Sequence, residues 1–276
     1  MLKRSQQSMA LTIIKTDHHI MAKRIFISGA AQGIGAAIAT FFHQNKWIVG
    51  IYDLDQEKVQ ALAQSLGDGA FAGELNVIDY ASWQNALADF VKHSGGLDIL
   101  VNNAGILYSG AFEDTPIEAH HRTVDVNVKG VLNGCHAALP YLKHAKNARV
   151  INLSSASAIC GQADLASYSS SKFAVRGITE GLDIEWRKHG IRVFDVMPLF
   201  VKTDMVTDMD AGSIKNMGVN LQPNDIAKAV WKLATGHTLL KNTHHPIGTS
   251  TKWMYRLSAM SPQLINRLSN IYLTRR

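Results

Sequence analysis

Short apolar runs alternate with longer segments of helical periodicity along most of this chain. Six runs are predicted strands: residues 24–28, 48–52, 71–75, 98–101, 149–154 and 191–197. Predicted helices follow them at 33–44, 55–66, 79–94, 116–144, 166–189 and 222–235. Because strand–helix–strand units have right-handed crossovers and put helices on both faces of a parallel sheet, the pattern predicts an α/β fold with a single doubly wound parallel sheet of about seven strands. In such sheets ligands bind at the carboxyl ends of the strands.

The charge of the chain is distributed unevenly. The 276 residues carry a net charge of +6, to which residues 1–20 contribute +2 and residues 241–276, which contain no acid, contribute +6. The body, residues 21–240, therefore carries −2. A slightly acidic body argues against a nucleic-acid-binding protein.

The two ends differ from the body, and no Pro/Gly/Ser-rich linker divides what lies between. We expect residues 1–21 to form a disordered tail, with Met21 as an alternative start, residues 22–252 to form one domain, and residues 253–276 to form an amphipathic, basic C-terminal extension. No window reaches about 18 uninterrupted apolar residues, so no transmembrane helix is predicted.

The two cysteines, Cys135 and Cys160, are too few for a disulfide framework and are interpreted as core residues of a cytoplasmic protein.

A glycine-rich turn, "SGAAQGIG" at residues 28–35, joins the first predicted strand to its helix. Gly29 permits a tight turn, and Gly33 and Gly35 allow the backbone to approach a pyrophosphate at the helix N-terminus. A plain strand-to-helix connection is the alternative, because a glycine-rich turn alone is weakly specific.

The second predicted strand ends in Asp53. A carboxylate at this position accepts hydrogen bonds from the hydroxyls of an adenosine ribose and repels a 2′-phosphate. Gln32 and Leu54 offer no cation for that phosphate, so the sequence favours NAD over NADP. The alternative is that Asp53 caps the helix that begins in "DLDQEK".

Tyr168 and Lys172 lie four residues apart in "ASYSSSKFAVRG". On a helix, positions i and i+4 share a face, so a phenol and an ammonium group can reach the same small volume. A nearby cation lowers the pKa of a phenol, whose usual value of about 10 makes it a poor base near neutrality. The alternative is an ordinary amphipathic pair with a half-buried tyrosine and a solvated lysine.

The glycine spacing, "NNAG" at 102–105, Asn127, Ser155 and "YSSSK" together resemble the short-chain dehydrogenase/reductase family over about residues 22–250. The resemblance implies a Rossmann-like fold, an NAD-dependent oxidoreductase that acts on an alcohol or ketone, and a homodimer or homotetramer formed through the helices at 116–144 and 166–189. Phe173, Ile184 and Trp186 are the apolar residues expected at that contact.

The family resemblance also implies a role for each member of a catalytic tetrad. Tyr168 is the expected general acid/base, and Lys172 is expected to lower its pKa and to hydrogen-bond the nicotinamide ribose. Ser155, preferred to its neighbour Ser154, is expected to donate to the reacting oxygen. Asn127, which read alone would be a polar surface residue, is expected to hold a water that links Lys172 to solvent.

The resemblance further implies a set of cofactor contacts. Besides Gly29, Gly33, Gly35, Asp53, Tyr168 and Lys172, these are Gln32, Ile34, Asn76, Val77, Asn103, Ala104, Gly105 and Thr203. Two positions depart from the family pattern: Asn76 replaces an aspartate that accepts from adenine, and Leu199 replaces a glycine after the sixth strand.

Residues 199–221 correspond to the variable substrate loop of the family. Its apolar residues are Phe200, Met205, Val206, Met209, Met217 and Leu221. They predict a small-molecule substrate that is a hydrophobic secondary alcohol or its ketone; a mobile lid that touches no ligand is the alternative.

The paired histidines, at 18–19, 120–121 and 244–245, are expected at the surface, and no metal site is predicted.

Two other functions stay open at this stage. A nucleotide-binding regulatory protein could keep the fold without turnover, and epimerase or dehydratase chemistry could use the same fold with further acid/base groups.

The C-terminal extension combines an apolar stripe with basic residues. Trp253, Leu257 and Met260, then Leu264, Leu268 and Ile271, recur at helical spacing on either side of Pro262, and Arg256, Arg267, Arg275 and Arg276 carry charge. A lid or a subunit contact is the preferred interpretation, and contact with an anionic membrane surface is the alternative.

Overall fold

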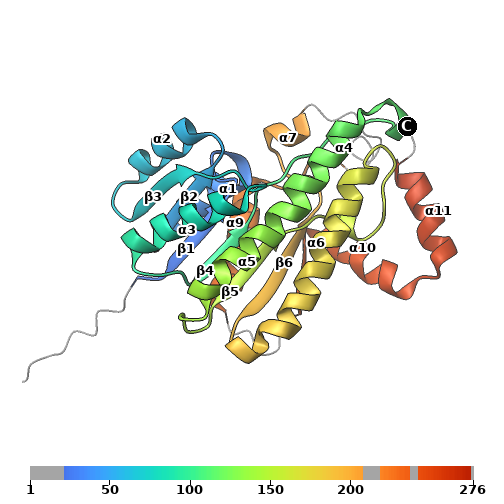
Figure 1. Cartoon of the computed structure of the whole chain (residues 1–276). Coiled ribbons are helices and arrows are strands. Elements are labelled where there is room, and N and C mark those ends of the chain that lie inside the picture. The colour runs from blue at the N-terminus through green and yellow to red at the C-terminus, as the bar shows by residue number, and fades with distance from the viewer. Residues whose placement is uncertain (1–21, 208–217, 237–241, 275–276) are drawn as a thin grey trace, which may run out of the picture.

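Seven parallel strands form one sheet in the computed structural model, which describes residues 22–207, 218–236 and 242–274 (Figure 1). The strands are β1 (Arg24–Ser28), β2 (Ile48–Asp53), β3 (Ala70–Glu74), β4 (Ile99–Asn102), β5 (Arg149–Leu153), β6 (Arg192–Pro198) and β7 (His244–Ile247). Their order across the sheet is β3-β2-β1-β4-β5-β6-β7. The predicted fold class, a single doubly wound parallel sheet of about seven strands, is confirmed.

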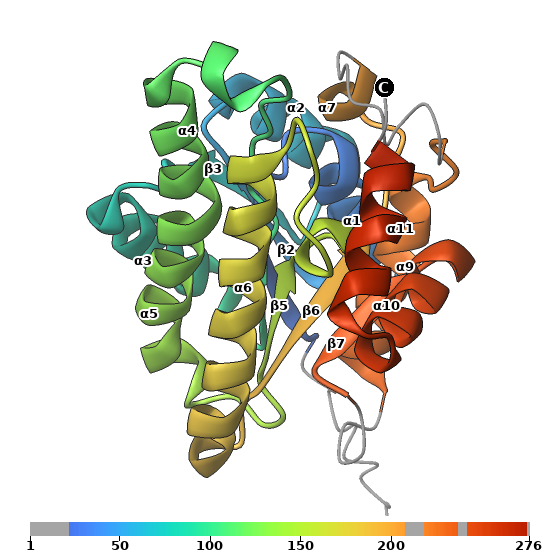
Figure 2. The same cartoon turned by 90° about the vertical axis from the view of Figure 1, so that its right-hand side faces the viewer.

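Helices cover both faces of the sheet, as Figure 2 shows for α3, α5 and α6 on one side and α9 on the other. One face packs against α1 (Gly33–Gln44), α2 (Gln56–Leu66) and α9 (Pro223–Thr235), and the other against α3 (Tyr80–Ser94), α5 (Gly130–Leu142) and α6 (Ala166–Glu185). Strands buried on both faces carry continuous apolar runs rather than alternating ones. In β5 every residue is buried.

The helix predicted over 116–144 is divided by a wider turn. It consists of α4 (Ile117–Val124), a π-helical segment (Asp125–Lys129) and α5. π-Helical turns re-aim side chains and occur often at functional sites. Here the turn carries Asn127, which is fully buried and therefore not the surface residue that its sequence alone suggested.

The last strand and the helices after it were not predicted in detail. β7 is short and begins with two histidines, so its sequence alone carries no strand signal, and it forms by pairing in parallel with β6. α10 (Thr249–Met260) and α11 (Gln263–Thr274) follow, so α10 begins before the expected boundary at residue 253. Among the described residues, no helix has the length and apolar content needed to cross a bilayer.

The prediction that His244 lies at the surface is wrong, because its side chain is largely buried. Its Nδ1 lies 2.7 Å from Asp195 Oδ2 and its Nε2 lies 2.6 Å from Glu180 Oε1. His245, the next residue, points away and meets the Asn242 carbonyl. The two side chains alternate because successive strand residues face opposite sides.

The strand order places a crevice between β1 and β4. β1 and β4 are neighbours, but β2 and β3 lie on one side of them and β5 to β7 on the other, which makes this the point where ligands bind in doubly wound sheets. Asn103 joins the two loops there, because its Nδ2 donates to the carbonyls of Ser28 at 3.0 Å and Gly29 at 2.7 Å.

Candidate active site

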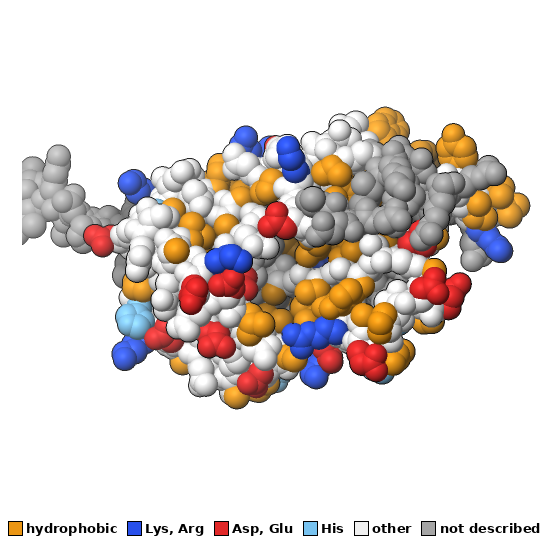
Figure 3. Space-filling model, turned by 90° about the horizontal axis from the view of Figure 1, so that it is seen from above, with side chains coloured by type: hydrophobic (Ala, Val, Ile, Leu, Met, Phe, Trp, Pro, Cys, Tyr) orange, Lys and Arg blue, Asp and Glu red, His pale blue; other side chains and the backbone are white. Residues whose placement is uncertain are grey.

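A cavity of about 570 Å³ opens at the carboxyl ends of the strands. Its volume is typical of small-molecule sites. Figure 3, which views the molecule from this end, shows hydrophobic side chains around a hollow and charged side chains along its rim. All predicted site residues line the cavity except Gly35 and Asn127, which lie behind its wall.

The glycine-rich loop approaches the loop after β4 closely. Gly29 has φ = +66°, and a Cβ atom there would lie 2.6 Å from the Cα of Ala104, so the turn and the close approach both require glycine. A Cβ on Gly33 would lie 3.3 Å from Thr203 Cγ2. A Cβ on Gly35 would overlap the Gly29 carbonyl oxygen, so glycine there permits the close packing of α1 against the turn after β1.

The start of α1 suits an anionic group. Its first turn carries no acidic side chain, and its N-cap residue, Gln32, makes no side-chain capping bond. Gln32, Gly33 and Ile34 all line the cavity at this point. Free backbone N–H groups and the helix dipole favour a phosphate there.

The end of β2 holds a fixed carboxylate beside the cavity. Asp53 Oδ2 accepts from the Ala31 amide at 3.0 Å, and Oδ1 accepts from the Asp55 amide at 3.2 Å. Asp55, not Asp53, caps α2 by accepting from the Lys58 amide, so the capping alternative for Asp53 is wrong. Glycine loop, helix terminus and strand-end carboxylate together fit the pyrophosphate and the ribose of a dinucleotide.

Sequence reasoning missed a cation on this rim. Lys58 lines the cavity, and its Nζ lies 2.8 Å from Asp55 Oδ2 with both side chains exposed. The hydrogen bond with Asp55 raises the pKa of Lys58, to which the charges of Asp53 and Asp204 also contribute. One helical turn separates Lys58 from Asp55, and this spacing was the signal available in the sequence.

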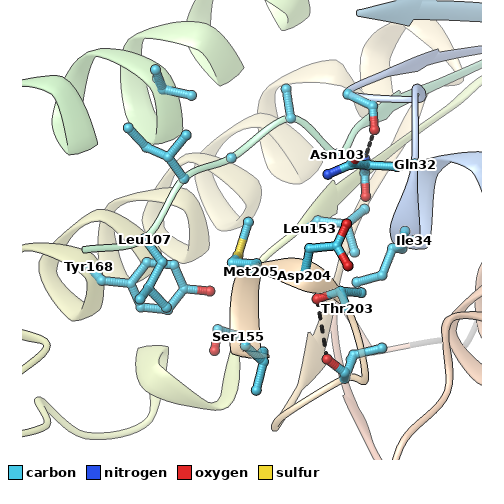
Figure 4. Close-up of a pocket in the computed structure, with 18 of the residues that line it drawn as sticks. Gln32, Ile34, Asn103, Leu107, Leu153, Ser155, Tyr168, Thr203, Asp204 and Met205 are labelled. Carbon is cyan, nitrogen blue, oxygen red and sulfur yellow. Dashed lines mark hydrogen bonds between the residues drawn. The ribbon is translucent and has the colours of Figure 1, made fainter. Parts of the chain in front are cut away.

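Tyr168 and Lys172 lie on successive turns of α6 and both line the cavity. Lys172 Nζ is 5.5 Å from the centre of the Tyr168 ring and donates to the Leu153 carbonyl at 2.8 Å. Figure 4 shows the Tyr168 hydroxyl extending toward Ser155, with Leu107 beside the ring. The pair is therefore not an ordinary amphipathic one, because Lys172 is buried.

Burial dominates the ionisation of both groups. It raises the pKa of Tyr168 to about 12, which a hydrogen bond with Ser155 opposes. It lowers the pKa of Lys172 to about 8. Lys172 is not among the groups that shift the pKa of Tyr168 here.

The two adjacent serines after β5 have different partners. The Ser154 hydroxyl donates to the Lys172 carbonyl at 3.3 Å and so ties the strand end to α6. Ser155 begins the short 3-10 helix Ala156–Ala158, where its Oγ accepts from the Ser157 amide at 3.1 Å. Of the two serines, Ser155 is the one that hydrogen-bonds Tyr168.

Asn127 joins the loop after β4 to α6. Its Oδ1 accepts from the Ile106 amide at 2.8 Å, and its Nδ2 donates to the Ile106 carbonyl at 2.9 Å and to Ser171 Oγ at 3.0 Å. A Cβ on Gly105 would lie 3.2 Å from Asn127 Oδ1 and 3.6 Å from Lys172 Nζ, so both polar groups border Gly105.

Positions that depart from the family pattern are accommodated locally. Asn76 Oδ1 accepts from the Ile78 amide at 3.3 Å, which shapes the turn after β3. Leu199 is not among the described residues with positive φ, so the side chain in the place of glycine causes no left-handed strain. Thr203 Oγ1 donates to the Val201 carbonyl at 3.3 Å, drawn as a dashed line in Figure 4.

The predicted substrate loop is only partly in the described chain. Phe200, Met205 and Val206 line the cavity, the last two from the short helix α7 (Asp204–Thr207). Leu221 instead packs against the core, and Met209 and Met217 lie outside the described residues.

Arg122 of α4 also lines the cavity. Sequence reasoning did not place a cation there, because nothing in the pattern of α4 showed which of its faces borders the site.

Comparison with known proteins agrees with this geometry. Residues 23–213 match the family model described as short chain dehydrogenase. Trans-4-hydroxycyclohexanecarboxylate dehydrogenase of Sinomonas cyclohexanicum is 34% identical over 207 residues, which cover 72% of this chain and 80% of that protein. 3-alpha-(or 20-beta)-hydroxysteroid dehydrogenase of Mycobacterium tuberculosis is 34% identical over 217 residues, which cover 78% and 84%.

Solved structures show the same fold. A 3-ketoacyl-(acyl-carrier-protein) reductase from Brucella melitensis, complexed with NADH, superposes with a TM-score of 0.76 at 29% identity and covers 81% of this chain and 96% of its own. A gluconate 5-dehydrogenase from Burkholderia cenocepacia, in complex with NADP and tartrate, gives 0.76 at 25% identity over 84% and 95%.

The chain therefore belongs to the short-chain dehydrogenase family, whose oxidoreductases use nicotinamide cofactors.

Proposed function

We propose that this chain is an NAD-dependent dehydrogenase or reductase of a hydrophobic secondary alcohol or its ketone. The observation that carries the proposal is the position of Tyr168, Ser155 and Lys172 in the same cavity as Asp53 and the start of α1. When bound, the nicotinamide ring donates or accepts the hydride. The residues of the chain do the rest.

Tyr168 would exchange a proton with the substrate oxygen at its hydroxyl, and the Ser155 hydroxyl would donate to the same oxygen. Because burial raises the pKa of Tyr168 to about 12, the phenol is protonated at neutral pH and ready to act as an acid in reduction. Lys172 is held by the Leu153 carbonyl beneath the ring, where it would contact the ribose and support a phenolate in oxidation. Asn127 fixes the Gly105–Ile106 backbone beside Lys172 and would hold a water there.

Asp53 supports the preference for NAD. Its carboxylate, oriented by the Ala31 and Asp55 amides, would accept from the ribose hydroxyls and repel a 2′-phosphate. Lys58 is the cation that could instead bind the 2′-phosphate of NADP, but it is paired with Asp55. Comparing Asp53→Ala with Lys58→Ala distinguishes the two cofactors. If the chain uses NADP, Lys58→Ala weakens NADP binding and Asp53→Ala leaves NAD binding unchanged.

The lining of the cavity supports the choice of substrate. The cavity that holds Tyr168 and Ser155 is also lined by Leu107, Leu153, Leu199, Phe200, Met205 and Val206. Relatives are named for cyclic substrates, a hydroxycyclohexanecarboxylate and a hydroxysteroid, which favours an alicyclic secondary alcohol. Arg122 allows for a carboxylate on that ring; Arg122→Ala would then raise KM for 4-hydroxycyclohexanecarboxylate and leave KM for cyclohexanol unchanged.

We also propose one dehydrogenase domain over residues 22–252 that forms a homodimer or homotetramer through α5 and α6. Leu132, Phe173 and Ile184 are exposed on these helices, whereas Trp186 is buried in the core and is not available for a contact. A mass of 30.3 kDa at micromolar concentration by light scattering would exclude this assembly. A cytoplasmic location is proposed from the two free thiols, Cys135 in the core and Cys160 only partly buried.

The test of catalysis is Tyr168→Phe, which keeps the ring and removes the proton. Turnover of cyclohexanol and cyclohexanone, followed by nicotinamide absorbance, should fall by about 10²- to 10⁴-fold, the scale of general acid/base catalysis, with NAD binding retained. Tyr141→Phe, a hydroxyl remote from the cavity lining, is the matched control and should leave turnover unchanged. Turnover within about threefold of the unaltered protein in Tyr168→Phe would show that the assignment is wrong.

A further inference from the structure

The two C-terminal helices expose large apolar side chains that nothing in the described chain covers. They are Trp253, Leu257 and Met260 on α10 and Leu264, Ile265, Leu268, Ile271 and Tyr272 on α11, each more than half exposed. Figure 2 shows α10 and α11 together on the outside of the molecule, with the upper end of α11 just below α7. Exposed large apolar side chains gathered on two successive helices mark an interaction surface.

These side chains point away from the rest of the molecule. On α10, Trp253, Leu257 and Met260 share one stripe, while Thr251 is buried on the opposite side. On α11, the side chain of Asn270 faces inward, where its Nδ2 donates to the Gly161 carbonyl and its Oδ1 meets Cys160 Sγ. A lid would turn its apolar face toward the cavity, so the predicted role as a lid is not supported.

Basic side chains border the apolar stripe. Lys252, Arg256 and Arg267 are exposed. Residues 241–276 contain no aspartate or glutamate that could neutralise them. An interface between two copies related by twofold symmetry would bring these like charges together, whereas an anionic surface complements them.

We propose that α10 and α11 bind the surface of an anionic phospholipid bilayer. An apolar helix face flanked by lysine and arginine is the pattern that lies in the interfacial plane of a membrane. Trp253 and Tyr272 are residue types enriched at that depth. In Figure 3 hydrophobic side chains at the right-hand end, with a basic side chain below them, project past the rest of the surface.

The test is co-sedimentation of the full chain with vesicles of phosphatidylcholine alone or with 30% phosphatidylserine. The unaltered protein should bind the anionic vesicles, bind the neutral ones much less, and be released by salt. Lys252→Glu/Arg256→Glu/Arg267→Glu should weaken binding by on the order of 10²-fold, since each basic residue near an anionic surface contributes roughly fivefold. Leu264→Gln/Leu268→Gln/Ile271→Gln keeps good helix formers and should also abolish binding.

A matched control reverses three exposed lysines elsewhere. Lys143→Glu/Lys146→Glu/Lys188→Glu changes the net charge equally near the ends of α5 and α6 and should leave vesicle binding within about threefold. Because both C-terminal variants keep residues 1–21, a loss of binding in them would not come from that segment. Failure of the unaltered protein to bind anionic vesicles, or equal loss in the control, would overturn the proposal. So would a fall in mass by light scattering in the glutamine variant without vesicle binding, which would make this face a subunit contact.

Discussion

The buried pair of Asp195 and His244 gives a prediction whose magnitude follows from the structure. Asp195 is completely buried in β6, and its Oδ1 has no hydrogen-bond partner. Its Oδ2 lies 2.7 Å from Nδ1 of His244, which is its charge partner, and Oε1 of Glu180 lies 2.6 Å from Nε2 of the same ring. His244→Ala would therefore leave a buried carboxylate without its cation.

Breaking a buried ion pair by removing one partner costs about 3–5 kcal/mol, because the remaining charge stays buried. His244 lies near the edge of the sheet, so water entering the vacated space would reduce the cost to about 3 kcal/mol, at the low end of that range. With an m-value of about 3 kcal/mol/M for a chain of this size, the urea midpoint should fall by about 1 M. Asp195→Ala/His244→Ala removes the charge as well and should be more stable than His244→Ala by at least about 1 kcal/mol.

Urea unfolding followed by circular dichroism at pH 7 measures these differences. His245→Ala removes the same atoms from the next position of β7 but leaves no buried charge without its partner, so it should lower the free energy of unfolding by about 1 kcal/mol. If His244→Ala were no less stable than His245→Ala, or if the double variant were the least stable of the three, the ion-pair argument would be refuted.

The pH dependence of stability follows from the same groups. Burial alone lowers the pKa of His244, but the hydrogen bonds and charges of Asp195 and Glu180 outweigh it and raise the pKa, against a smaller opposing effect of Arg176. A raised pKa means that the folded state holds its proton longer than the unfolded chain, so this stabilisation is complete below about pH 6.5 and is lost as the pH rises through the folded value. The free energy of unfolding of the unaltered protein should accordingly lose this contribution as the pH rises from about 6.5 through the folded pKa of His244, as measured by urea unfolding at a series of pH values.

Further predictions concern the cofactor loops. Asp53→Ala should weaken NAD binding by about tenfold or more and raise the affinity for NADP relative to NAD, since one carboxylate supplies both effects. Fluorescence titration with both cofactors measures this, and an unchanged ratio of the two affinities would contradict it. Gly29→Ala should lower the free energy of unfolding by about 1–3 kcal/mol and abolish most NAD binding, because φ = +66° and the approach of Ala104 leave no room for a Cβ. If titration calorimetry gave this variant the NAD affinity of the unaltered protein, the prediction would be wrong.

Much of the fold was predictable from local patterns. Apolar runs and helical periodicity located six strands and most of the helices to within a few residues, because burial on both faces of a parallel sheet imposes continuous apolar strands. β7 was not predicted, since its His-His-Pro-Ile sequence becomes a strand only by pairing with β6. The division of the helix at 116–144 was not predicted either, because the wider turn depends on the hydrogen bonds between Asn127 and Ile106.

The sequence by itself determined the residue types that the chemistry needs and their order along the chain. Glycines, Asp53, Ser155, Tyr168 and Lys172 follow strand ends or share a helix face, and parallel strands bring their carboxyl ends to one edge. Only the tertiary structure decided what surrounds them: burial, not Lys172, controls the pKa of Tyr168. It also placed Lys58 and Arg122 at the cavity, paired His244 with Asp195, and turned the C-terminal apolar stripe outward. Burial and contact between distant segments depend on packing in three dimensions, and no local pattern of residues encodes them.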